Sequence, residues 1–81
     1  MASEATIMRR LCVSAAEAAS MIGVGRTLYL QMDRTGELGP QSRKLGGRRL
    51  WSVEELAAWV RAGMPPRGRW AQIWDAAQGD K

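Results

Sequence analysis

The sequence contains no histidine, no phenylalanine and a single cysteine, Cys12. A lone cysteine excludes an intramolecular disulfide, and the ligands of a structural zinc site are missing without histidines or further cysteines. We therefore expect neither a metal nor a cofactor. In the absence of phenylalanine, four tryptophans and five methionines supply many of the large apolar side chains available for a core.

Long hydrophobic runs are missing as well. No stretch approaches the roughly 20 apolar residues that span a bilayer, and residues 1–10 lack the apolar segment of a secretory signal. We expect a cytoplasmic, nucleoid-associated protein without a membrane partner. A chain of 81 residues predicts one domain, preceded by a disordered leader at 1–10 and followed by a frayed tail at 79–81.

Side chains suited to catalysis are scarce. Cys12 has no evident base beside it, and Asp33 and Glu37 stand isolated among cations. Glu54 and Glu55 are neighbours on a predicted helix, so their side chains diverge by about 100° and form a poor metal clamp. Acidic residues in a first helical turn are better explained by the helix dipole. We expect a protein that is not an enzyme.

Positive charge is concentrated in the middle of the chain. Residues 26–49 carry six cations and two anions, and the rest of the chain is neutral overall. A cationic surface localised in this way favours a polyanionic partner. A solvated loop with a chance excess of arginine is the alternative, and composition alone leaves the two interpretations about even.

Two capping boxes mark the starts of helices. The Ser-x-x-Glu pattern at 14–17 begins a helix that should end at Gly23. The same pattern at 52–55 begins another helix, with Gly63 as its C-cap. Apolar residues at helical spacing predict a last amphipathic helix at 67–78.

A further helix is predicted at Arg26–Arg34, entered through Gly25 and ended by Gly36. Its inward side is expected to carry Leu28, Tyr29 and Met32, and its outward side Arg26, Thr27, Leu30, Gln31 and Arg34. Two short helices joined by a glycine-containing turn are typical of the helix-turn-helix, whose second helix enters the major groove of DNA. An ordinary polar surface helix is the alternative, but a leucine on the outward side favours the DNA interpretation.

The basic segment ends in a predicted hairpin. Gly46-Gly47 suits a tight two-residue turn that needs positive φ. We expect Leu45 and Leu50 to point towards the body and Lys44 and Arg49 to point outwards. Such a slender tip can approach a phosphate backbone or enter a minor groove. A charged hairpin without a partner is the alternative, and a nucleotide site is disfavoured because no Lys-Ser/Thr pair follows the glycines.

The tryptophans divide into two pairs. Trp51 and Trp59 are predicted to lie in the core. Trp70 and Trp74 either dock the last helix on the domain or leave an apolar patch for another protein. The second possibility makes a protein-interaction adaptor the alternative function from a different class.

Residues 11–66 resemble the small excisionase-like proteins of the MerR-type winged helix-turn-helix superfamily, which include the AlpA-like regulators of phages and prophages. The resemblance follows five segments in order: 11–19, 22–26, 36–38, 44–51 and 52–60. It implies a mainly α domain at 11–66, with three to four short helices and a two-stranded β-hairpin wing, and the helix at 67–78 appended to it.

The resemblance also implies a function. In that family the second helix reads the major groove, and the wing contacts the neighbouring backbone or minor groove. The chain would be an excisionase that bends attachment-site DNA or, alternatively, a prophage transcriptional regulator. Its expected partners are duplex DNA, a site-specific recombinase and further copies of itself, with no small-molecule effector. The predicted DNA-binding residues are Arg26, Thr27, Leu30, Gln31, Arg34, Arg43, Lys44, Arg48 and Arg49.

Three features depart from the family pattern. Gly25 stands where the family usually has serine or threonine, so one helix cap is weakened. Residues 39–42 make an irregular approach to the wing, and the segment from Arg67 onwards lies outside the common core.

Overall fold

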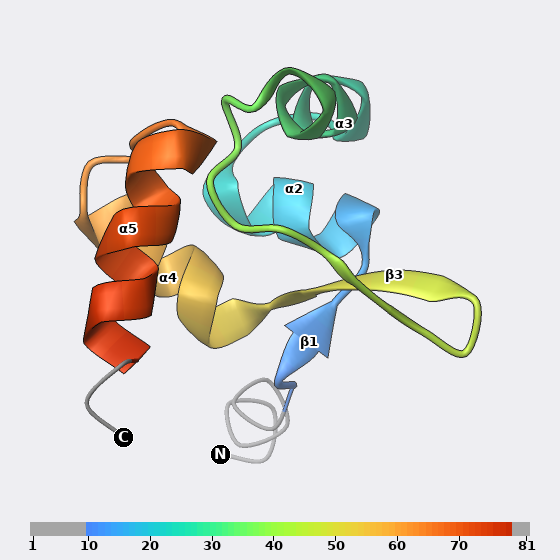
Figure 1. Cartoon of the computed structure of the whole chain (residues 1–81). Coiled ribbons are helices and arrows are strands. Elements are labelled where there is room, and N and C mark those ends of the chain that lie inside the picture. Colours follow the sequence, from blue (N-terminus) through green and yellow to red (C-terminus); the bar gives the residue numbers. More distant parts are fainter. Residues whose placement is uncertain (1–9, 79–81) are drawn as a thin grey trace, which may run out of the picture.

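A computed structural model describes residues 10–78 and shows four helices and a three-stranded antiparallel sheet in that range (Figure 1). The elements are β1 (Cys12–Val13), α2 (Ala15–Ile22), α3 (Arg26–Thr35), β2 (Arg43–Leu45), β3 (Arg48–Ser52), α4 (Val53–Arg61) and α5 (Arg67–Gln78). Helix predominates. The predicted tail and all of the predicted leader except Arg10 lie outside the described residues.

The predicted start of α2 is confirmed in atomic detail. The Ser14 hydroxyl accepts from the amide of Glu17, and the Glu17 carboxylate accepts from the amide of Ser14. These two bonds satisfy donors that a helix N-terminus otherwise leaves free. Arg10 forms an ion pair with the same carboxylate. Gly23 then ends the helix in the left-handed conformation, with φ of 89°.

The sheet has one strand more than the sequence predicts. The sequence predicts a two-stranded hairpin wing, but Cys12 and Val13 also pair with Ser52 and Trp51 of β3. The strand order is β1-β3-β2, so β3 lies in the centre. The pairing joins residues 12 and 13 to the hairpin. It should stabilise the hairpin, because a two-stranded hairpin alone is at best marginally stable in water.

The hairpin turn is as predicted, but its orientation is not. Gly46 and Gly47 both have positive φ, 59° and 81°, as a two-residue hairpin turn needs. Arg49, however, lies on the same strand face as the fully buried Trp51. The face with Leu45 and Leu50 therefore points away from the core, and Leu45 is 53% exposed.

Three tryptophans form the centre of the core: Trp51, Trp59 and Trp70 are all buried. Around them pack Val13, Ala18, Ala19, Tyr29, Leu38 and Leu56. The Trp59 indole donates to the carbonyl of Pro65 at 2.8 Å. Because Trp70 belongs to this cluster, α5 is docked on the domain. The half-buried Trp74 stacks on Trp70 with 5.5 Å between ring centroids.

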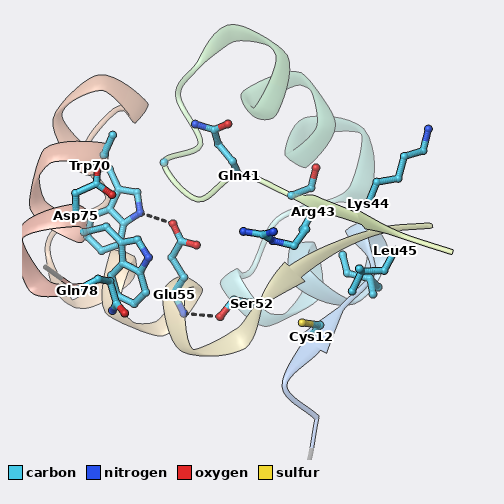
Figure 2. Close-up of a pocket in the computed structure, with 15 residues that line it drawn as sticks. Cys12, Gln41, Arg43, Lys44, Leu45, Ser52, Glu55, Trp70, Asp75 and Gln78 are labelled. Atoms are coloured by element: carbon cyan, nitrogen blue, oxygen red, sulfur yellow. Dashed lines mark hydrogen bonds between the residues drawn. The ribbon is translucent and has the colours of Figure 1, made fainter. Parts of the chain in front are cut away.

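The second capping box forms only in part. The Ser52 hydroxyl accepts from the amide of Glu55, but the Glu55 carboxylate accepts from the indole of Trp70 at 2.8 Å (Figure 2). Because α5 packs against this end of α4, the Glu55 side chain bonds to Trp70 and not to the backbone amide of Ser52 as the capping box predicts. Among the described residues, none of the helices is both long and apolar enough to cross a bilayer.

Candidate nucleic-acid interface

The turn between α2 and α3 is held by backbone hydrogen bonds. The amides of Gly23 and Val24 both donate to the carbonyl of Ala19, and the amide of Tyr29 donates to the carbonyl of Gly25. Gly25 is the N-cap of α3 but supplies no side-chain hydrogen bond. Since Ala18 and Ala19 are small and fully buried, α2 can pack closely against its neighbours. α3 is thereby presented beside α2 (Figure 1).

The rotation of α3 differs from the predicted one at two leucines. Tyr29 and Met32 face the body as expected, with Tyr29 completely buried. Leu28 was expected inside but is 46% exposed, and Leu30 was expected outside but is half-buried against the core. The reason is the edge-to-face contact of Tyr29 with Trp51, 5.1 Å between ring centroids, which turns α3 towards the hairpin.

The outer side of α3 carries polar and cationic groups. Thr27, Gln31 and Arg34 are exposed and recur at i, i+4 and i+7, so they form one stripe along the helix. Arg26 is also exposed, at the first turn. These four residues of the predicted set lie on the surface with donors and acceptors available.

The hairpin and α3 share a surface hollow. Arg26 and Leu30 of α3 line it together with Arg48 and Arg49 of β3, in a volume of about 360 Å³. The start of α2, residues 14–16, and the ring of Trp51 complete the lining. Four of the predicted site residues, from elements far apart in the sequence, are thus brought together. The hollow lies between the first turn of the helix and the strand that returns from the hairpin tip.

Arg49 is not the free outward cation that the sequence predicts. Its guanidinium donates to the carboxylate of Asp33 on α3 at 2.5 Å and to the hydroxyl of Ser42 at 2.9 Å. It also lies over the ring of Trp51, 5.0 Å from the centroid. Arg49 therefore joins the hairpin to α3.

Asp33 is not isolated either. Its second oxygen accepts from Arg67 of α5 at 2.7 Å, and its side chain is only 13% exposed. Arg67 additionally donates from Nε to the carbonyl of Leu38 and from its backbone amide to the carbonyl of Gly36. Sequence reasoning missed this cluster because Asp33 and Arg67 are 34 residues apart and no local motif connects them.

The remaining cations of the hairpin point in different directions. Arg43 and Leu45 lie on one side of it and Lys44 on the other (Figure 2). Arg43 lines a second hollow, of about 740 Å³, between the outer face of the sheet and α5. Lys44 pairs in register with Arg49. Lys44 lines the same second hollow, so neither Arg43 nor Lys44 lines the hollow beside α3.

Buried polar groups near the site belong to the core. Burial raises the pKa of Tyr29, and the neighbouring Asp33 carboxylate raises it further, while Arg49 opposes the shift. The phenol is therefore neutral. Its hydroxyl and the indole nitrogen of Trp51 find no hydrogen-bond partner among the described residues. In the same part of the chain no three acidic, cysteine or histidine side chains gather as metal ligands would.

The site is therefore a cationic helix and hairpin joined through a carboxylate. A comparison of this chain with protein-family models, curated proteins and solved structures finds no match.

Proposed function

We propose that this chain is a winged helix-turn-helix protein that binds duplex DNA without catalysis. In this proposal α3 lies in the major groove, which is wide enough for one helix and displays a different pattern for each base pair. The hairpin lies on the adjacent backbone or in the minor groove. The observation that carries the proposal is the hollow that Arg26 of α3 and Arg48 of the hairpin both line.

The exposed residues of α3 divide by chemistry. Arg26 suits guanine, whose O6 and N7 accept two hydrogen bonds from one guanidinium, and Gln31 suits adenine in the same way. Thr27 has a hydroxyl for a phosphate and a methyl for thymine. Arg34, in the last turn, faces a phosphate. Leu30 contributes mainly to packing because it is half-buried.

The hairpin supplies contacts that are independent of sequence. Lys44 and Arg48 are exposed near a turn without side chains, so the backbone of the tip can come close to phosphates. Arg49 is already paired with Asp33 and orients the hairpin instead of neutralising a phosphate. Arg43, on the other side, adds to the positive field that draws the duplex in.

The biological role that we propose is that of an excisionase. A helix and a hairpin that occupy neighbouring grooves favour a bent duplex, because bending brings more backbone into contact. Regulation of prophage transcription is the alternative role and uses the same surface. The adaptor alternative loses its main support, since Trp70 is buried in the core and is not exposed for a partner.

Selection of bound sequences from random duplexes, run at two ionic strengths, tests the proposal. We expect a short preferred motif that persists at the higher salt concentration and total binding that falls steeply with salt. Binding without any preferred motif would contradict the proposal that α3 recognises bases. Excision or repression assays with the selected sequence then separate the two biological roles.

A further inference from the structure

Three elements of the chain meet at one carboxylate. Asp33 on α3 accepts from Arg49 of the hairpin through one oxygen and from Arg67 of α5 through the other, at 2.5 and 2.7 Å. The carboxylate is therefore shared between a residue inside the proposed DNA site and one outside it. α5 lies at the side of the molecule away from the hairpin tip (Figure 1).

We propose that Arg67 is a positioning residue that sets the spacing between α3 and the hairpin through Asp33. The inference rests on the proposed function. In that function the spacing sets how far the hairpin, on the DNA backbone, lies from α3 in the major groove. It gives α5 a role in DNA recognition although that helix does not touch the duplex.

The contacts of Arg67 suit this role. The side chain is 27% exposed, and its guanidinium donates both to Asp33 and to the carbonyl of Leu38 at 3.1 Å. A planar guanidinium fixes the direction of both bonds, which an ammonium group cannot do. The backbone amide of Arg67 donates at 2.8 Å to Gly36, the C-cap of α3. Arg67 thus holds the last turn of α3 and the carboxylate that receives Arg49.

A fixed spacing affects specific and non-specific binding differently. Specific binding needs base contacts from α3 and backbone contacts from the hairpin at the same time, so a hairpin that moves relative to α3 adds an entropic cost. Non-specific binding depends on the number of cations that neutralise phosphates. Loss of Arg67 should therefore lower the ratio of specific to non-specific affinity more than it changes the salt dependence.

The experiment compares three variants of the full chain: Arg67→Met, Arg67→Lys and Arg69→Met. Arg69 is a matched control, because it lies on the same helix, is exposed, and has no hydrogen bond or ion pair among the described residues. Affinities are measured for the selected sequence and for a scrambled duplex. Residual dipolar couplings of the backbone amides report the orientation of α3 relative to the hairpin in the free protein.

We expect Arg67→Met to reduce the ratio of specific to non-specific affinity by about threefold to tenfold. The dipolar couplings of α3 and of the hairpin should then no longer fit one common alignment tensor. Arg67→Lys should restore part of the ratio, because it keeps the positive charge. It should not restore all of it, because an ammonium group lacks the planar pair of donors of the guanidinium. It also serves as the test if the methionine variant does not fold. Arg69→Met should leave the ratio and the common alignment as in the wild type.

An unchanged ratio together with an unchanged orientation in both Arg67 variants would overturn the inference. So would an equal loss in Arg69→Met, because the charge of α5 and not the contact would then be responsible. If the wild type binds no duplex at either ionic strength, the proposed function fails, and the dipolar couplings still decide whether Arg67 holds the hairpin against α3.

Discussion

The indole nitrogen of Trp70 donates a hydrogen bond of 2.8 Å to the carboxylate of Glu55. This bond joins α5 to the first turn of α4, and Trp70 itself is almost completely buried. α5 therefore packs into the same core as α3, the helix that we propose contacts the bases.

Trp70→Ala should therefore destabilise the protein strongly. Loss of a buried tryptophan costs about 3–5 kcal/mol, which is much of the stability of a small domain. Trp70→Phe should cost less, about 1–3 kcal/mol, because it keeps most of the apolar surface and loses the hydrogen bond to a carboxylate. Urea unfolding measures both. Ile73→Ala, at an exposed position of α5, is the control and should change stability by about 0.5 kcal/mol or less.

The two glycines Gly39 and Gly25 should respond in opposite ways to added side chains. A Cβ on Gly39 would lie 2.5 Å from Trp59 Nε1 and 2.8 Å from Trp70 Cγ. Gly39→Ala should therefore destabilise by about 1–3 kcal/mol through overpacking. Gly25 has open space and extended backbone at the N-cap of α3, so Gly25→Ser should stabilise by about 0.5–1 kcal/mol. Thermal unfolding of both variants decides, and a stabilised Gly39→Ala would contradict the packing described for the two tryptophans.

Arg26 and Arg48, which both line the hollow, should play different roles in binding. Arg26→Ala should cost about 1–3 kcal/mol on the preferred sequence and relax the preference at one base pair. Arg48→Ala should weaken binding to all sequences alike and flatten the salt dependence by about one unit. Competition titrations with matched and scrambled duplexes separate the effects. Identical behaviour of the two variants would contradict the division between α3 and the hairpin.

The pairing of Arg49 with Asp33 predicts the size of the salt dependence. Besides Arg43, four exposed cations remain on α3 and the hairpin: Arg26, Arg34, Lys44 and Arg48. Counterion release from four phosphates gives a log–log slope of about −4. Arg49→Ala should leave this slope nearly unchanged, and titrations at several salt concentrations measure it. A slope that falls by a full unit would show that Arg49 leaves Asp33 for a phosphate.

Asp33→Asn should produce the opposite change. The substitution removes a negative charge beside the duplex and releases Arg49, so affinity for random duplex should increase and the slope should steepen by about one unit. Glu37→Gln is the control that removes an exposed anion without freeing an arginine, and its slope should remain near the wild-type value. Equal slopes for the two variants would contradict the role of Asp33 as the internal partner of Arg49.

Local signals in the sequence predicted the local structure well. The capping box of Ser14 and Glu17 and the Gly46-Gly47 turn depend on residues only a few positions apart, and both formed as predicted. The predicted burial of Trp51 and Trp59 is also confirmed, but the orientation of α3, which depends on distant packing, was predicted wrongly at two leucines. The rotation of α3, which exposes Leu28 and half-buries Leu30, follows from the contact between Tyr29 and Trp51.

The orientation of Arg49 towards the body is contained in the sequence. Trp51 was expected in the core, and side chains two apart on a strand share a face, so Arg49 had to point towards the body with it. The role of Arg67 carried no such signal, because its partner lies on a different helix. The positive charge of residues 26–49 therefore did not show which of its cations are exposed and which, like Arg49, are paired within the protein.

The claim that α3 and the hairpin bind one duplex on a common side is tested most directly by amide chemical-shift mapping during titration with the selected duplex. The account predicts that shifts at 26–34 and 44–48 move together with one affinity, while those of the exposed side of α5 remain unchanged. Shifts confined to α5, or at α3 without the hairpin, would contradict it.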